Sequence, residues 1–400
     1  MGAEFSKHDS CSLSAKEFAV TEADRHQVAI IGAGPAGLAA AAALRAKGVR
    51  PTVFERGDDV GSSWRRHYDR LHLHTVRWLS GLPGMAIPRA EGPWVSRDGV
   101  IRYLEAYTAY HGIDVRTGVT VEKVARAPEG WVLRSSLGDE HADAVIVATG
   151  YNHTPVLPDV PGIDDYTGEL LHASDYRNGR PYAGKDVLVV GPGNTGAEIA
   201  VDLVEHGAGR VRLAVRTPPY LLRRALGPIP TQLTGVALRR VPAAIADRLA
   251  EIGRKFQVPD LSDKGLPDPG PGLVTRARRG QIPILDVGLI DAVRVGKVEP
   301  VAALAGFDGE AVRLTDGSVL TPDAVIIAAG YRRGLEDLVG HLGVLDARGH
   351  PRVHGRTTRP DAPGLHFIGY TNPLSGMFRE IAIDAKRIAS SVSASAVTTA

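Results

Sequence analysis

The sequence predicts an α/β fold built from two units of parallel strands and helices, with the second unit inserted into the first. Three observations carry this prediction. Short apolar strands alternate with helices from residue 26 onward, the order that gives a parallel sheet covered on both faces. A glycine-rich loop follows a strand at two places about 160 residues apart, and two other apolar strands end in turns of small residues.

Length, charge and cysteine content narrow the class of protein. The chain has 400 residues, enough for two domains, and its 47 basic and 45 acidic side chains leave a net charge of only +2. This balance favours neither a nucleic acid nor an anionic membrane as partner. The single cysteine, Cys11, excludes a disulfide framework and the paired thiols of flavin-dependent disulfide reductases. The lack of cysteine pairs predicts a reducing, cytoplasmic setting. Charged residues near Met1 argue against a signal peptide, and glycines and a proline in the longest apolar stretch argue against a membrane span.

The first unit begins with a strand expected at 27–31, a helix at 39–47 and a second strand at 50–54. Glu55 ends this second strand, where a carboxylate can accept hydrogen bonds from a ribose diol. This order of strand, glycine loop, helix, strand and acid is typical of a dinucleotide-binding, Rossmann-like unit.

The glycines of the first loop have separate roles. Gly32 permits a tight turn, Gly34 lets the backbone approach a diphosphate, and Gly37 lets helix and strand pack closely. The diphosphate would lie at the helix N-terminus, where free N–H groups favour negative charge. The remaining cofactor-binding residues predicted in this loop are Pro35 and Ala36.

The same order returns with a strand at 186–190, a helix at 196–206 and a strand at 210–215. Arg216 follows the last of these strands, where the first unit has an acid. A guanidinium can bind a 2′-phosphate through two hydrogen bonds, so the second unit is predicted to prefer NADPH over NADH. An ordinary exposed arginine is the alternative for this position. The predicted loop residues are Gly191, Gly193, Asn194, Thr195 and Gly196.

Two apolar runs, 145–151 (VIVATGY) and 325–331 (VIIAAGY), each place a buried strand before a turn of small residues. In flavoproteins that bind two nucleotides, such turns carry the chain between domains, so Thr149 and Gly150 are cofactor-binding candidates. The predicted organisation is an FAD-binding domain in two pieces around an inserted NADPH-binding domain. Its boundaries are a flexible leader at 1–25, FAD domain at 26–180 and 323–390, NADPH domain with a substrate-side insertion at 181–322, and a flexible tail at 391–400.

Residues 234–256 have apolar side chains at helical spacing, which predicts one amphipathic helix. The apolar stripe is expected to be core or a subunit contact, as in a homodimer, rather than a membrane-surface anchor. Residues 262–279 are rich in Pro, Gly and Arg and are expected to be an irregular connection. The stripe consists of Leu238, Val241, Ile245, Leu249 and Ile252.

Further motifs resemble those of the class B flavin monooxygenases, in particular the plant indole-3-pyruvate monooxygenases of auxin synthesis and their bacterial relatives. An aromatic, glycine, histidine and aromatic series before the second glycine loop is similar to the fingerprint of these monooxygenases. The resemblance covers about residues 26–390. Its motifs are Tyr166, Gly168, His172 and Tyr176, the flavin-side segments 61–65, 68–74 and 103–107, and the segments 265–267, 283–288 and 364–369.

The resemblance implies that NADPH reduces FAD, that reduced flavin takes up O2, and that a C4a-(hydro)peroxyflavin oxygenates a small organic substrate. The implied reactions are N- or S-oxygenation, or oxidative decarboxylation of a 2-oxo acid. Asn194 and Thr195 would hold the nicotinamide nucleotide, and His172 and Asn194 are the candidates for catalytic residues, although His172 equally fits a brace for the interdomain linker. No metal is implied. The residues that the resemblance places along the flavin are Trp64, Arg65 and His74, and Arg56 and Gly369 are further cofactor-binding candidates.

The chain also departs from the family pattern. Tyr166 replaces the leading phenylalanine of the fingerprint and Arg177 follows its last aromatic, which favours the general branch over the Baeyer–Villiger branch. Residues 75–78 lack the asparagine that many animal members carry near the flavin. The basic pairs at 223–224 and 278–279 either attract an acidic substrate or are solvated loop residues. Two rival functions stay open, namely an NADPH oxidase or reductase without oxygen insertion, and a nucleotide-sensing binding protein.

Overall fold

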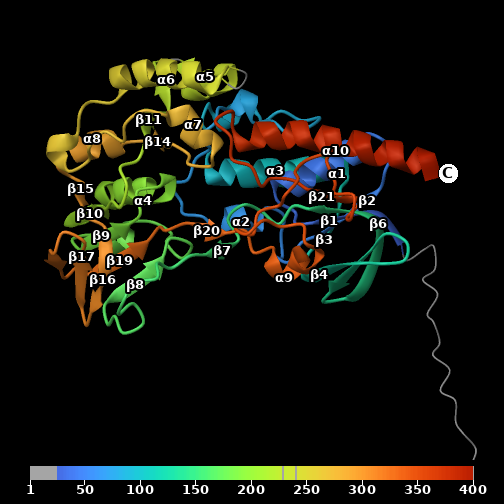
Figure 1. The fold of residues 1–400 in the computed structure, drawn as a ribbon, viewed down its shortest axis with the longest axis horizontal. Helices are drawn as coiled ribbons and strands as arrows, with labels where there is room; N and C mark the ends of the chain where they lie inside the picture. Colours follow the sequence, from blue (N-terminus) through green and yellow to red (C-terminus); the bar gives the residue numbers. More distant parts are fainter. Residues whose placement is uncertain (1–24, 228, 239–240, 400) are drawn as a thin grey trace, which may run out of the picture.

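The computed structural model describes residues 25–227, 229–238 and 241–399, and the leader predicted at 1–25 lies outside them except for Arg25. Two sheets stand side by side, each with helices packed against it (Figure 1). The first sheet has the order β3-β2-β1-β6-β5-β4, with β21 beside β6. Its strands are β1 (Arg25–Ile31), β2 (Pro51–Phe54), β3 (Asp114–Arg116), β4 (Val121–Arg126), β5 (Trp131–Ser135), β6 (Gly138–Val147) and β21 (Leu365–Phe367).

The centre of the first sheet is apolar on both faces. β1 lies between β2 and β6 in parallel register, and Val28, Ala29 and Ile30 on it are fully buried. The alanine-rich α1 (Pro35–Arg45) packs on this sheet and against α3 (Arg97–His111) and α10 (Met377–Thr399). Small side chains let these helices approach closely, so the loop before α1 is held rigidly at the carboxyl end of β1.

The second sheet has the order β15-β10-β9-β19-β8 and is parallel throughout. Two of its strands, β8 and β19, come from outside the predicted range 181–322. The boundaries predicted at 180 and 322 therefore cut through this sheet, because an apolar parallel strand does not reveal which sheet it joins. The strands are β8 (Glu169–His172), β9 (Asp186–Val190), β10 (Arg210–Ala214), β15 (Glu299–Val301) and β19 (Ala324–Ile327), and α4 (Asn194–Glu205) and α8 (Leu289–Arg294) pack together beside them.

The chain passes between the two sheets twice, at the turns that end β6 and β19. The segments after these turns, β7 (Thr154–Pro155) and β20 (Tyr331–Arg332), pair antiparallel with each other. The chain enters the second sheet after β7 and returns through β20 and α9 (Glu336–Val339) to β21. The predicted α/β fold, with the second unit inserted into the first, is confirmed by this path.

A cap of short elements lies over the second unit, where Figure 1 shows α5 and α6 outermost. The single helix predicted at 234–256 is two helices, with Pro242 preceding the second. Ile245, Leu249 and Ile252 are more than half exposed, so this part of the stripe is not core, and the subunit contact stays a prediction. The cap consists of β11 (Leu221–Arg223), β12 (Ala225–Leu226), β13 (Ile229–Pro230), α5 (Thr231–Leu238), α6 (Ala243–Gln257), α7 (Leu273–Arg278) and β14 (Ile284–Asp286).

Other boundaries differ from the prediction. α1 and α4 begin at Pro35 and Asn194, inside the glycine loops, because each loop leads directly into its helix. The connection expected at 262–279 contains α7, and residues 391–399 continue α10 where a tail was predicted. No described helix is long and apolar enough to span a bilayer. The remaining elements are α2 (Ser62–Arg65), β16 (Leu304–Asp308), β17 (Ala311–Leu314), β18 (Val319–Leu320) and 3-10 turns at Arg77–Leu79, Arg89–Glu91, Arg180–Tyr182, Ser262–Lys264 and Gly340–Leu342.

Candidate functional site

The first glycine loop has the geometry of a diphosphate cradle. Gly32 has φ +106°, and a Cβ there would lie 2.5 Å from the carbonyl oxygen of Ala148. A Cβ on Gly37 would lie 1.9 Å from the carbonyl oxygen of Gly32, so helix and turn meet without a side chain between them. Gly34, the N-cap of α1, has ordinary extended backbone angles and open space where its Cβ would be. That open space lies at a helix N-terminus, where an anion is stabilised.

Glu55 braces this loop from the end of β2. Its side chain is nearly buried, and its Oε2 and Oε1 accept hydrogen bonds from the backbone N–H groups of Ala33, at 2.8 Å, and Gly57, at 2.9 Å. A carboxylate can accept about four hydrogen bonds, so acceptor capacity is left for a ligand. The residue thus orders the turn and also lines the adjoining cavity.

The second glycine loop repeats this geometry at β9 and α4. Gly191 has φ +110°, and a Cβ on Gly196 would lie 2.0 Å from the carbonyl oxygen of Gly191. Gly193, the N-cap of α4, again has extended angles and nothing within 4 Å of a Cβ position. Arg216 lies exposed, two residues beyond β10. The two loops are therefore matched in their turns and in the open space at their helix N-termini.

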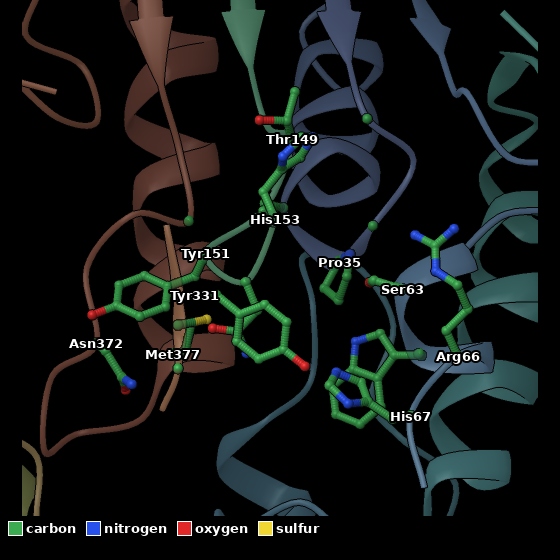
Figure 2. A pocket seen from close by; sticks show the side chains of 18 of the residues that line it. Pro35, Ser63, Arg66, His67, Thr149, Tyr151, His153, Tyr331, Asn372 and Met377 are labelled. Carbon is green, nitrogen blue, oxygen red and sulfur yellow. The ribbon is translucent and has the colours of Figure 1, made fainter. Parts of the chain in front are cut away.

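Both loops open onto one cavity of about 590 Å³, the cofactor cavity (Figure 2). Its walls come from both units of the fold and from the N-terminal turn of α10. Two nucleotides bound at the two loops would therefore meet inside it. The predicted residues that line it are Gly32, Gly34, Pro35, Ala36, Glu55, Arg56, Trp64, Thr149, Gly150, His172, Gly193, Asn194, Thr195 and Gly369.

Six predicted cofactor residues do not line this cavity. Gly37, Gly191 and Gly196 shape the turns behind it. Arg65 points elsewhere, with its guanidinium bonded to the Glu105 carboxylate and to a backbone carbonyl, and its neighbour on the chain lines the cavity instead. Along a helix each residue turns by about 100°, so one position decides which arginine faces the cavity. The other two are Arg216, described above, and His74, which lines the neighbouring cavity.

Several residues of the cofactor cavity were not predicted. Tyr151, Tyr331 and His67 are labelled among its lining side chains in Figure 2 and come from three different segments. Burial lowers the pKa of His67 to about 4, so this imidazole is neutral at neutral pH. The two tyrosines directly follow the small-residue turns, and that position is the signal by which they could have been found. The remaining unpredicted lining residues include Arg66, His153, Asn372, Met377 and Phe378.

The two candidates for catalytic residues each contact a segment that is distant in sequence. The Asn194 side chain donates to the carbonyl of Pro283 and accepts from the N–H of Leu285, and so ties the second loop to β14. His172 is buried at the end of β8, where its ring packs edge-on against Tyr331 at 5.1 Å between centroids. Burial lowers its pKa. Both residues line the cofactor cavity, and their side chains position its walls.

An apolar cavity of about 430 Å³ adjoins the cofactor cavity under the cap. The two share Trp64, Asn194 and Phe378 among other lining residues. Eight of its lining residues are leucine, and Trp64 and Phe378 add aromatic rings. Its polar lining residues are threonine, asparagine, glutamine and one histidine, a mixture that is usual for small-molecule sites. A substrate in this cavity would lie directly beside the cofactors.

His74 joins the two units at the wall of the apolar cavity. Its Nε2 hydrogen-bonds to the carboxylate of Glu198, a residue of α4 that is only 2% exposed. The Tyr68 hydroxyl lies beside the same carboxylate, and burial, followed by this charge, raises its pKa. Sequence reasoning found His74 but no carboxylate for it, because Glu198 is distant along the chain. The pair can hold and pass a proton at the edge of the apolar cavity.

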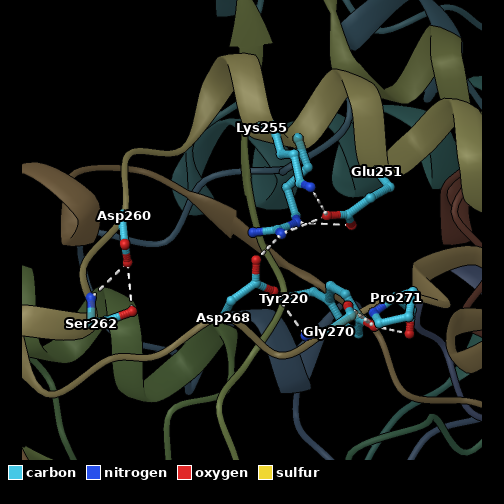
Figure 3. A network of polar contacts seen from close by, with 9 residues as sticks. Tyr220, Glu251, Lys255, Asp260, Ser262, Asp268, Gly270 and Pro271 are labelled. Carbon is cyan, nitrogen blue, oxygen red and sulfur yellow. Dashed lines mark hydrogen bonds and ion pairs between the residues drawn. The ribbon is translucent and has the colours of Figure 1, made fainter.

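A network of polar contacts holds the cap together, and Figure 3 shows it around Glu251, Asp268 and Tyr220. Arg254 on α6 is 6% exposed and pairs with Glu251 at 2.9 Å and with Asp268 at 2.6 Å. The hydroxyl of Tyr220 lies 2.7 Å from the carbonyl oxygens of Gly270 and Pro271. Arg254 thus ties α6 to the 268–271 segment, and Tyr220, just before β11, ties the same segment to the body of the cap.

Comparison with known proteins agrees with two nucleotide-binding loops on one cavity. The family model described as flavin-binding monooxygenase-like matches residues 133–338, and the model described as pyridine nucleotide-disulphide oxidoreductase matches residues 29–226. The indole-3-pyruvate monooxygenase YUCCA1 of Oryza sativa subsp. japonica is 37% identical over 86% of this chain and 86% of its own length. The chain belongs to the flavin-binding monooxygenase-like family.

Two further proteins similar to this chain support the family assignment. The probable indole-3-pyruvate monooxygenase YUCCA8 of Arabidopsis thaliana is 32% identical over 91% of the chain and 88% of its own length. The solved flavin-containing monooxygenase from Stenotrophomonas maltophilia has the same fold, with a TM-score of 0.69, 24% identity, and coverage of 92% of this chain and 99% of that one. The protein is thus a flavin monooxygenase that uses FAD and NADPH, as predicted. Its two open helix N-termini on one cavity fit these cofactors.

Proposed function

We propose that this monooxygenase converts an arylalkyl 2-oxo acid to the carboxylic acid with one carbon fewer, releasing CO2. One atom of O2 enters the acid, the other leaves as water, and NADPH is oxidised to NADP+. The observation that carries the proposal is the cofactor cavity, which receives both glycine loops and adjoins an apolar cavity. The plant relatives are named indole-3-pyruvate monooxygenases, and this supports a 2-oxo acid as substrate over N- or S-oxygenation.

The chain's own residues would bind and orient the two nucleotides. The FAD diphosphate would lie at Gly34, with its ribose on Glu55, and the NADPH diphosphate at Gly193, with its 2′-phosphate on Arg216. Bound FAD supplies hydride acceptance from NADPH and the reaction with O2. The remaining lining residues would enclose the space where nicotinamide and flavin rings meet.

Residues between the two cavities would have two roles. Aromatic rings would keep water out, and a histidine would carry a proton. Trp64 and Phe378 line both cavities, and their rings meet edge-on at 5.9 Å between centroids. Apolar rings at this wall exclude water. A dry site limits the side reaction in which reduced flavin and O2 give only hydrogen peroxide. His74 would carry the proton at Nε2 and exchange it with Glu198.

The test is a substrate panel of 2-oxo acids, sulfides, amines and ketones, scored for NADPH loss together with oxygenated product. We expect arylalkyl 2-oxo acids to give CO2 in step with NADPH consumption. NADPH loss that yields only hydrogen peroxide for every substrate would favour the oxidase. Oxygenated sulfide or amine without reaction of any 2-oxo acid would replace the proposed substrate class.

A further inference from the structure

A third cavity of about 340 Å³ lies between the end of α7, the 370–375 segment and the turn at 348–350. It shares Tyr151 and Asn372 with the cofactor cavity, and Leu238 and Val274 with the apolar cavity. The third cavity therefore adjoins the other two at these shared residues.

The lining of the third cavity is strongly basic. It contains four arginines and one histidine, and among the described residues that line it there is no aspartate or glutamate. Arg279 and Arg348 at its rim are exposed, and neither forms an ion pair within the described part of the chain. Such a lining attracts anions and raises their local concentration. The basic residues are Arg278, Arg279, Arg333, Arg348 and His350.

Arg333 is the buried centre of this group. It is 9% exposed, and its guanidinium lies 3.3 Å above the ring centroid of Tyr151. One terminal nitrogen donates to the carbonyl oxygens of Tyr151, at 3.1 Å, and Tyr331, at 3.2 Å, while the buried Nε has no hydrogen-bond partner. No described carboxylate pairs with this cation. Burying a charge without a counterion is costly, so an anionic ligand bound at Arg333 would offset this cost.

We propose that the third cavity binds the carboxylate of an organic acid whose apolar body occupies the apolar cavity. Arg333 is the main contact, and Arg279 and Arg348 steer the acid inward. The inference rests on the proposed function, because it assigns the acid group of the same substrate. A carboxylate fits better than a cofactor phosphate, since neither glycine loop nor Arg216 lines this cavity.

The experiment measures equilibrium binding to FAD-loaded, oxidised protein without NADPH, so no turnover is involved. The probes are 3-phenylpropanoate and its neutral amide, titrated by calorimetry. We expect the carboxylate to bind at least about tenfold more tightly than the amide, as one charge-assisted contact provides, and to weaken as salt rises. Equal affinity of the two probes for the wild-type protein would overturn the proposal.

Variants then locate the contact. Arg333→Gln should remove the preference for the carboxylate, while Arg348→Gln, a change at an exposed position that leaves folding intact, should lower it two- to threefold. Arg294→Gln, on α8 and outside the cavity, is the matched control and should change nothing. An unchanged preference in both cavity variants would contradict the assignment.

Two further arms separate the sources of failure. If Arg333→Gln weakens NADPH binding instead of carboxylate binding, the anion is a cofactor phosphate and the inference is wrong. If the carboxylate preference holds but no 2-oxo acid is oxygenated, the proposed reaction fails and the anion site stands.

Discussion

Replacing Gly34 by valine separates the effect on cofactor binding from the effect on folding. Backbone angles at Gly34 are φ −80° and ψ −176°, which a β-branched residue adopts readily, and nothing lies within 4 Å of the Cβ position. The free energy of unfolding should therefore change by no more than about 1 kcal/mol. The side chain would instead occupy the space that we assign to the FAD diphosphate.

The expected loss follows from the contacts that the diphosphate could no longer make. Two charge-assisted hydrogen bonds from backbone N–H groups contribute about 3 to 6 kcal/mol, so FAD affinity should fall at least about 100-fold. Purified Gly34→Val protein should be folded by circular dichroism and colourless. FAD content after reconstitution, measured by absorbance, is the assay.

Matched variants sharpen the result. Gly193→Val has the same open surroundings in the second loop and should keep FAD while losing NADPH affinity. Gly37→Ala places a Cβ 1.9 Å from a carbonyl oxygen and should lower stability itself. Normal FAD content in folded Gly34→Val protein would refute the placement of the diphosphate at the start of α1.

Three other predictions follow from the site. Arg216→Ala should raise the Michaelis constant for NADPH about 10- to 100-fold and leave that for NADH nearly unchanged; an equal rise for both would remove the 2′-phosphate assignment. His67 is held neutral, with a folded pKa of about 4 against 6.5 unfolded, so the unfolded chain binds its proton first as pH falls. Lowering the pH from 7 to 5 should cost about 2 kcal/mol more in wild-type protein than in His67→Gln, by urea unfolding, and parallel pH profiles would contradict this. Arg254→Ala leaves Asp268 without its ion pair and Glu251 with only the longer contact to Lys255, at 3.9 Å, and should destabilise the cap by about 2 kcal/mol. The change should appear as faster proteolysis at 241–271 with unchanged FAD affinity; unchanged cleavage would show that Arg254 does not hold the cap.

The glycine loops were predictable because every part of their geometry is local. A strand, a turn that only glycine can make, and a helix N-terminus follow one another within a few residues, so their spacing predicts their shape. The open positions at Gly34 and Gly193 are consequences of the same local order.

Other features depend on contacts between distant residues, and no local pattern predicts them. Glu198 contacts His74 across 124 residues of sequence, and Arg333 contacts Tyr151 across 182 residues. The apolar spacing around Leu249 predicted a helix correctly, but periodicity cannot say whether a stripe faces core or solvent. β19 was likewise predicted correctly as a buried strand, but its apolar sequence could not show that it pairs with β9 in the second sheet.

The central claim is that both loops deliver their nucleotides into one cavity, where hydride can pass between them. Anaerobic mixing of FAD-loaded protein with stoichiometric NADPH tests it directly, with the visible absorbance of oxidised flavin as the measurement. We predict complete bleaching at one NADPH per FAD. Tight NADPH binding with flavin that stays oxidised would show that the two rings do not meet and would contradict the account.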